Sequence, residues 1–449
     1  MTASRVKTFR DRRISVLQSA LAERLYRQGK AARRDWNASD HQDMHELVDA
    51  ATRVTGRKAH GRAASEIAPD HPSGIARNCA SAVMSVLFGT VRQRLIALAE
   101  LSRFGHCDAG WLRVIVAYYW RTWFGSTIPY RAASSGVNPV IDIPEGRCRI
   151  AIIGDWGTGT QMAQMVLDRV AGFRREEPHV PFILIHVGDV YYSGSRREFE
   201  RFAAQIRTCF PKEPVYTLSG NHDMYGGGAA YYDCISTLNP APYTQQASFF
   251  VLRNSCWQLQ AMDTGLHDTN PSEVNSNLTF LDPGEVAWHR AQIAARGTRK
   301  VVLFSHHQPF SAFSPVGQDA QKNAVYLNRR LLSAFDGQGP DALGTDLLPF
   351  ITAWFFGHEH NTVIYEPYAG VSRARCLGSS AVPTDPRDCD PYHAMDATIT
   401  WDDKVRLSIH EGIYTHGYAI LDLDGPSADV RYFQYPGGSK GELLFLERL

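Results

Sequence analysis

The sequence contains little that would indicate a disulfide scaffold, a membrane span or a surface built to coat nucleic acid. Its eight cysteines form no Cys-x-x-Cys pair and follow no regular spacing, so we expect reduced, mostly buried thiols. The most apolar stretch, residues 111–124, is interrupted by Arg113 and Arg121 and is shorter than the roughly 20 residues that span a bilayer. The net charge of +1, from 47 basic and 46 acidic side chains, argues against a surface that as a whole binds nucleic acid.

An export signal is also missing from the first 34 residues, which carry ten Lys and Arg against Asp11 and Glu23 and contain no apolar core. This composition has some likeness to an organellar transit peptide, but its serine content is low. We therefore expect the segment to belong to the mature protein and the protein to be cytoplasmic. The simplest interpretation of residues 5–34 is a solvated helix face, and contact with nucleic acid or an anionic membrane is the functional alternative.

The chain divides into two regions with different sequence patterns. Residues 1–135 carry apolar side chains at three- and four-residue steps, which predicts a helical N-terminal domain of unknown role. Residues 136–147 have the Gly, Asn and Pro content of a linker. Residues 148–449 then alternate short apolar runs with helical stretches at 161–173, 198–208 and 285–295. From about residue 364 the pattern turns β-rich, with strands expected at 398–401, 405–409, 417–423 and 428–435.

Five predicted strands in the second region each lead into a polar residue. The runs 149–153, 182–185, 215–218, 301–304 and 354–356 are followed by Asp155, Asp189, Asn221, His306 and His358. Loops at the carboxyl ends of strands are where α/β sheets gather ligands and catalytic groups. A Gly-Asp or His-x-His alone is usually incidental, but five such motifs in order are unlikely to coincide. We therefore expect one site built from these loops.

The residues in these loops offer carboxylate, phenol, amide and imidazole groups. They are Asp155, Asp189, Tyr192, Asn221, His222, Asp223, His306, His307, His358 and His360. Oxygen and nitrogen ligands of this kind suit Fe, Mn or Zn rather than a thiolate site. They are too many for one tetrahedral ion, and a carboxylate can bridge two. Two ions about 3.5–4 Å apart form the usual clamp for in-line phosphoryl displacement.

In this order the motifs resemble those of the calcineurin-like metallophosphoesterases: Asp-x-His, Gly-Asp, Gly-Asn-His-Asp/Glu, His and Gly-His-x-His. The resemblance covers roughly residues 148–435. The first motif reads Asp155-Trp156-Gly157 here, so its histidine is missing. The purple acid phosphatase branch has the same loss and a tyrosine in Gly-Asp-x-x-Tyr instead, which Gly188-Asp189-Val190-Tyr191-Tyr192 supplies. The site is therefore similar to that branch.

The resemblance implies an α/β (α+β) fold, a four-layer α/β/β/α sandwich spanning residues 148–449, and a dinuclear metal centre. The first ion, which a phenolate ligand suggests is ferric, would be held by Asp155, Asp189, Tyr192 and His360. Asp189 would bridge to a second ion, Fe, Mn or Zn, held by Asn221, His358 and either His306 or His307. His306 is favoured, because it aligns with the family's ligand position without a gap.

The same resemblance makes His222 the candidate general acid for the leaving alkoxide. Asp223 would fix its tautomer through the other ring nitrogen, or would only stabilise the turn. Beyond these motifs, Asp263-Thr264-Gly265 with His267 and Asp268 could lie near the site.

The expected activity is hydrolysis of a small phosphorylated substrate by in-line attack of a metal-bound water or hydroxide. One alternative is a cyclic-nucleotide or nucleic-acid phosphodiesterase with the same metal pair. The other is an interaction protein that uses the hydrolase fold as a scaffold.

Overall fold

The computed structural model describes residues 127–449, except 272, 274–275, 339–343, 385, 387–389, 411–412 and 437–440, together with Val114, Ala117, Tyr118, Arg121 and Thr122. The chain divides into two units after Val116, and all described residues except Val114 belong to Ala117–Leu449. The basic segment 5–34 and most of the helical domain predicted over 1–135 lie outside the described residues. Among the described residues, no helix has both the length and the hydrophobicity to cross a bilayer.

A six-stranded sheet carries the first three motifs. Its strands, in the order β17-β16-β15-β2-β3-β4, are β17 (Glu442–Arg448), β16 (Ser427–Tyr435), β15 (His416–Asp424), β2 (Arg147–Ile153), β3 (Phe182–His186) and β4 (Val215–Thr217). β2, β3 and β4 run parallel, and β15 pairs antiparallel with β2. β3 and β4 are buried along their whole length, which requires that both faces of the sheet be covered.

A seven-stranded sheet carries the last two motifs. Its strands, in the order β1-β5-β6-β7-β10-β12-β11, are β1 (Val140–Asp142), β5 (Phe250–Arg253), β6 (Trp257–Ala261), β7 (Lys300–Ser305), β10 (Ile351–Phe356), β12 (Ala374–Leu377) and β11 (Thr362–Ile364). β6, β7, β10 and β12 are parallel. β1 lies inside the segment predicted as a linker, where it pairs with β5. Two hairpins complete the strands: β8 (Gly317–Gln318) with β9 (Ala324–Val325), and β13 (Ile409–His410) with β14 (Ile413–Tyr414).

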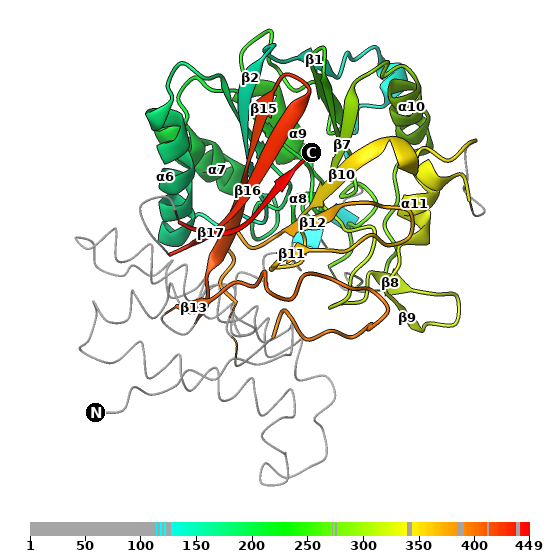
Figure 1. Cartoon of the computed structure of the whole chain (residues 1–449). Helices are drawn as coiled ribbons and strands as arrows, with labels where there is room; N and C mark the ends of the chain where they lie inside the picture. Colours follow the sequence, from blue (N-terminus) through cyan, green and yellow to red (C-terminus); the bar gives the residue numbers. More distant parts are fainter. Residues whose placement is uncertain are drawn as a thin grey trace, which may run out of the picture. The chain divides into compact units, whose positions relative to one another are not determined.

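Helices cover the two outer faces, with α6 (Gln161–Glu176) and α7 (Arg196–Cys209) on one side of the sandwich and α10 (Pro283–Ala294) and α11 (Arg329–Asp336) on the other (Figure 1). Their starts follow local chemistry: Thr160 caps α6, a Ser195–Glu198 capping box opens α7, and Asp282 before Pro283 opens α10. The remaining elements are α8 (Asn221–Tyr225), α9 (Ala229–Leu238) and the 3-10 turns η1 (Ala133–Ser135) and η2 (Leu348–Phe350).

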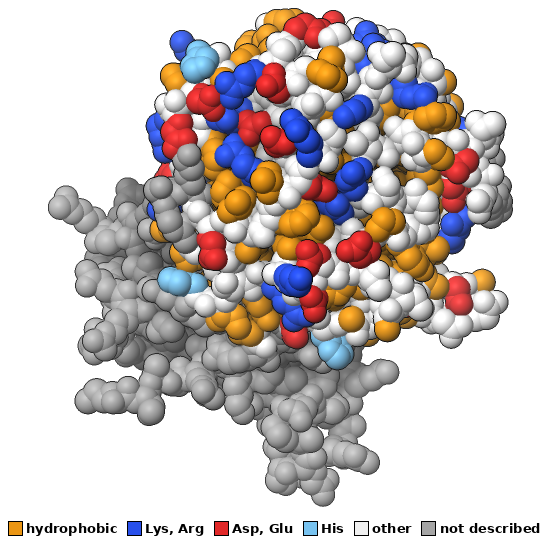
Figure 2. All heavy atoms as spheres, in the orientation of Figure 1, with side chains coloured by type: hydrophobic (Ala, Val, Ile, Leu, Met, Phe, Trp, Pro, Cys, Tyr) orange, Lys and Arg blue, Asp and Glu red, His pale blue; other side chains and the backbone are white. Residues whose placement is uncertain are grey.

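Three apolar cores show the layering. Along β2, Ile150 and Ile152 pack between the sheets against residues such as Val302 and Phe304, whereas Ala151 and Ile153 face the core under α6 and α7. A third core joins the seven-stranded sheet to α10 and α11. The predicted four-layer α/β/β/α arrangement of the domain is therefore confirmed. On the face seen in Figure 2, basic and acidic side chains are interspersed over the described surface, in keeping with the balanced charge.

Candidate metal centre

The predicted site residues converge from both sheets. Asp155, Asp189 and Asn221 follow β2, β3 and β4, while His306 and His358 follow β7 and β10. Parallel strands place their carboxyl ends at one edge, and the two sheets bring these edges together. The Asp155 carboxylate spans the two, because its Oδ2 accepts the His358 backbone N–H at 2.8 Å. The strand-end motifs thus form one site.

A first group of donor atoms gathers around the Asp155 carboxylate. The Tyr191 hydroxyl donates to Asp155 Oδ1 at 2.8 Å and lies 2.9 Å from His360 Nε2. His360 Nε2 lies 3.6 Å from the same carboxylate oxygen. Ligands that each sit about 2.0–2.2 Å from a shared ion are themselves about 3–3.5 Å apart. The spacing of these three atoms fits one ion.

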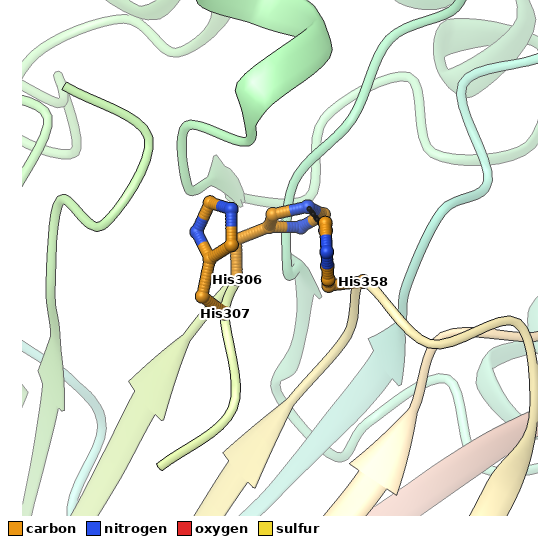
Figure 3. Close-up of side chains that lie close together, drawn as sticks. All are labelled: His306, His307 and His358. Atoms are coloured by element: carbon orange, nitrogen blue, oxygen red, sulfur yellow. Dashed lines mark hydrogen bonds between the residues drawn. The ribbon is translucent and has the colours of Figure 1, made fainter. Parts of the chain in front are cut away.

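A second group gathers around the amide oxygen of Asn221. Asn221 Oδ1 lies 3.1 Å from His306 Nε2 and 3.1 Å from His358 Nδ1, and these two nitrogens are 3.2 Å apart. Asp189 Oδ2 is 3.3 Å from His306 Nε2. Figure 3 shows the His306 and His358 imidazoles meeting beyond the ends of their strands, with the His307 ring beside them. These four atoms fit a second ion.

The tautomer of His306 is fixed by its surroundings. Its Nδ1 lies 2.9 Å from the Val187 carbonyl oxygen, which can only accept, so Nδ1 carries the proton. Nε2 therefore faces Asn221 Oδ1 and Asp189 Oδ2, both of which carry lone pairs. A proton on Nε2 satisfies these acceptors in the metal-free protein, and a bound metal ion would take the place of that proton. The donor set thus suits a metal ion.

The pKa values of Asp189 and His306 show that this cluster favours positive charge. Burial raises the pKa of Asp189, but the His306 and His222 imidazoles outweigh it and hold the pKa below its ordinary value. Burial lowers the pKa of His306, but the Asp189 carboxylate outweighs it and raises the pKa to about 9. Asp189 belongs to both groups, since its ligand atom and those of Asp155 and His306 all lie within 4.8 Å of one another.

Several ligand candidates have strained or crowded backbones. Asp155, Asp189 and His358 have φ of 54°, 73° and 67°, a region that side-chain-bearing residues rarely adopt and that clusters at functional sites. Gly220 makes one close approach possible, because a Cβ there would lie 2.0 Å from Asp189 Oδ1. The loops are therefore shaped around the carboxylates.

The phenol of Tyr191 reaches the donor atoms, whereas the Gly-Asp-x-x-Tyr spacing predicts Tyr192 as the ligand. Tyr192 contributes its backbone: its N–H donates to Glu198 Oε1 at 2.7 Å, and its carbonyl lies 2.6 Å from His222 Nδ1. The Glu198 carboxylate also accepts the N–H groups of Ser193 and Ser195. This buried carboxylate holds the loop so that Tyr191 points at Asp155.

The role predicted for Asp223 on His222 is wrong. The Asp223 carboxylate accepts the backbone N–H groups of Gly220, Val190 and Asp189 at 2.7, 2.8 and 3.1 Å, so it joins the two ligand loops. His222 instead donates from Nδ1 to the Tyr192 carbonyl, and its Nε2 lies 3.8 Å from Asp189 Oδ2. Burial lowers the pKa of His222, and Asp189 partly opposes this.

The two adjacent histidines have different surroundings. His306 joins the second donor group, whereas the His307 ring has Thr264 Oγ1 3.0 Å from Nδ1 and Asp268 Oδ2 3.1 Å from Nε2. Thr264 and Asp268 belong to the segment that the sequence placed near the site, as possible neighbours outside the motifs. The motifs did not single out Tyr191 or Glu198 as site residues.

The sandwich and its strand-end donors define a metallophosphoesterase-type domain. The sequence profile of the calcineurin-like phosphoesterase family matches residues 148–362, so the chain contains a calcineurin-like phosphoesterase domain. No match was found among the curated proteins.

Three solved structures are similar to this chain. GAP50, described as the anchor in the inner membrane complex of Plasmodium, is 14% identical (TM-score 0.43; 68% of this chain and 89% of that chain covered). A dimetal phosphatase from Danio rerio is 12% identical (TM-score 0.41; 67% and 98% covered). A 5'-nucleotidase precursor from Thermus thermophilus is 15% identical (TM-score 0.28; 67% and 54% covered). At these TM-scores the likeness says nothing of function. Assignment to the purple acid phosphatase branch finds no support in the profile or in these structures.

Proposed function

We propose that the domain hydrolyses a phosphate ester with the help of two metal ions. Asp155, Asp189, Tyr191 and His360 would hold the first ion. Asp189, Asn221, His306 and His358 would hold the second. The observation that carries the proposal is the convergence of Asn221 Oδ1, His306 Nε2 and His358 Nδ1 to within 3.1–3.2 Å of one another, with the His306 tautomer already fixed by Val187.

When bound, the two ions supply the Lewis acidity that polarises the phosphoryl group and makes a water nucleophilic. The oxygen and nitrogen donors suit Fe, Mn or Zn, and the Tyr191 phenol favours ferric iron in the first position. His222 is the general acid in its doubly protonated form: it gives the proton on Nε2 to the leaving alkoxide, while Nδ1 keeps its hydrogen bond to the Tyr192 carbonyl. Because burial lowers the pKa of this ring, the acid form is favoured as the pH falls. Its ring lies against Tyr191 and Tyr225, with centroid distances of 4.4 and 4.9 Å.

The substrate class is proposed as a small phosphorylated molecule. A cyclic-nucleotide or nucleic-acid phosphodiesterase would use the same donors and His222, so the choice between monoester and diester is a matter for assay. The scaffold alternative gives no role to the carboxylate, amide and imidazole groups that converge at one buried point, whereas metal binding does. The cytoplasmic location stays a prediction.

The test is removal and return of the metals. A chelator should abolish hydrolysis of 4-nitrophenyl phosphate or of bis(4-nitrophenyl) phosphate, and Fe, Mn or Zn should restore it, with the preferred ester showing monoesterase or diesterase activity. Metal content should approach two ions per chain in the active protein. A chain that binds none of these ions and hydrolyses neither ester with any of them would contradict the proposal.

His222→Ala provides the control against a scaffold role. Loss of a general acid costs about 10²–10⁴-fold in kcat, and the cost should be greatest for an alkyl phosphate, whose leaving group needs the proton most. Metal content should stay at the wild-type level, because His222 is outside both donor groups. If kcat for both ester types is unchanged, another residue is the acid.

A further inference from the structure

The loop Asp263–Asp268, which follows β6, is a sixth strand-end loop at the site. β6 is the parallel neighbour of β7, so this loop lies beside the loop that carries His306 and His307. Thr264 Oγ1 accepts the backbone N–H of His307 at 3.0 Å and also meets its Nδ1 at 3.0 Å. Asp268 Oδ2 lies 3.1 Å from His307 Nε2. All three side chains are buried.

These contacts leave His307 little freedom. The ionised Asp268 carboxylate can only accept a hydrogen bond, so His307 Nε2 carries a proton and donates to it. Nδ1 of the neutral ring then accepts a hydrogen bond from the Thr264 hydroxyl. Both ring nitrogens therefore already have hydrogen-bond partners, although one of them lies within 4.8 Å of ligand nitrogens of His306 and His358. His307 is 6% exposed and Asp268 is 1% exposed, so water cannot readily replace either partner.

The locked ring packs on both histidines of the second donor group. The centroid of His307 lies 4.8 Å from that of His306, nearly perpendicular at 89°, and 4.5 Å from that of His358, inclined at 40°. Figure 3 shows the three imidazoles gathered at the ends of β7 and β10. The plane of His307 thus limits how the other two rings can turn. A small rotation of either ring would move its donor nitrogen out of the group.

We propose that Asp268 is a positioning residue for the second metal ion: by locking His307 it holds His306 and His358 in the orientation that binds the ion. The inference rests on the proposed function, because it concerns the affinity of that same site. Asp268 acts through His307 and does not itself join either donor group. Outer partners of this kind typically contribute about 10–100-fold to metal affinity.

The test is a Mn²⁺ titration of the metal-free protein, with the second site identified as the one that His306→Ala removes. Asp268→Ala should weaken Mn²⁺ binding at that site about 10–100-fold and leave the other site near the wild-type value. His307→Ala should weaken the same site. The double variant should be no weaker than His307→Ala alone, because Asp268 acts only through that ring. Asp268→Asn should retain most of the affinity, since its amide oxygen can accept the same N–H.

A purely structural role is separated by a matched control. Asp336, buried at 5% exposure and paired with Arg329 at 2.9 Å, stabilises α11 away from the donors, so Asp336→Ala should lower thermal stability without changing Mn²⁺ affinity. If Asp268→Ala behaves in the same way, or if the folded His307→Ala variant binds Mn²⁺ as the wild type does, this inference fails while the proposed function stands. If the wild-type protein binds no metal, both fail.

Discussion

Tyr191 and Tyr192 are a matched pair of adjacent buried phenols, and the observed hydrogen bonds place the hydroxyl of Tyr191 on the donor atoms. Burial and the charges of Asp155 and Asp189 raise the pKa of Tyr191 well above its ordinary value. Its phenolate would therefore form only when a cation takes the place of the proton. In the iron-loaded protein, Tyr191→Phe should abolish a phenolate-to-ferric charge-transfer band that Tyr192→Phe retains, as visible absorption would show. Loss of the band in Tyr192→Phe and its retention in Tyr191→Phe would mean that Tyr192 is the ligand.

The sequence allows the types of site residues to be predicted better than their partners. Asp155, Asp189, Asn221, His306, His358 and His360 were predicted as site residues from motif position, because α/β sheets gather ligands in the loops at the carboxyl ends of their strands. Which of two neighbouring tyrosines points inward depends on how Glu198 holds the loop, and that contact is a tertiary feature. The partner of Asp223 was mistaken for a similar reason. A carboxylate in a tight turn can accept three backbone N–H groups, and nothing in the motif distinguishes these from an imidazole.

At the scale of elements, the turn between β4 and α8 is limited by the Asp189 carboxylate. A Cβ at Gly220 would lie 2.0 Å from Asp189 Oδ1 and 2.8 Å from the backbone nitrogen of Asp189, so the turn or the Asp189 carboxylate must move. Gly220→Ala should therefore abolish binding of at least one metal ion and reduce activity to background. Metal analysis and ester hydrolysis would check this.

Gly172 is the matched control, because it lies within α6 and a Cβ there meets only the end of the Arg175 side chain, at 3.8 Å. Alanine should stabilise that helix by about 0.5–1 kcal/mol and leave metal binding unchanged. Normal metal content in Gly220→Ala would mean that the loop adapts, and that the close approach is incidental.

The strands that could be predicted from the sequence are those that are buried along most of their length. The strands of both sheets that carry ligands are apolar along most of their length, because helices and the opposite sheet cover them. The expected strands at 398–401 and 405–409 do not form as such: Trp401 makes only an isolated antiparallel bridge to Tyr365, and the short β13 begins at Ile409. There the apolar side chains pack individually, as Trp401 does by stacking on Tyr392 with ring centroids 5.5 Å apart. A similar alternation of apolar and polar residues thus serves a loop as well as a strand.

For the whole domain, the site joins the two halves of the sandwich. The six-stranded sheet supplies Asp155, Asp189 and Asn221, and the seven-stranded sheet supplies His306, His358 and His360. Ions bound there would connect the sheets in addition to the apolar core between them. Motif order predicted these residues as ligands, but it did not reveal that they come from opposing sheets, because the order of strands within a sheet is fixed by long-range pairing.

Buried neutral histidine should also make the metal-free domain sensitive to acid. His416, at the start of β15, is 1% exposed, and its Nδ1 donates to the Ser379 carbonyl at 3.1 Å. Its Nε2 has no hydrogen-bond partner among the described residues. Burial lowers the pKa of this ring to about 4, against an ordinary value of 6.5. Between these pH values the unfolded chain binds a proton that the folded chain does not, so the free energy of unfolding falls as pH falls.

The slope from this one group is about 1.4 kcal/mol per pH unit, which amounts to about 3 kcal/mol over the whole window. His416→Gln keeps an N–H for the Ser379 carbonyl but has nothing to protonate. The free energy of unfolding of the metal-free protein, measured with urea from pH 7 down to pH 4, should therefore change less steeply with pH in the variant. The difference in slope corresponds to about one proton. Above pH 7 the two proteins should differ by a constant. Equal slopes in the acid range would mean that the folded protein admits the proton at His416, and that another buried group governs its acid stability.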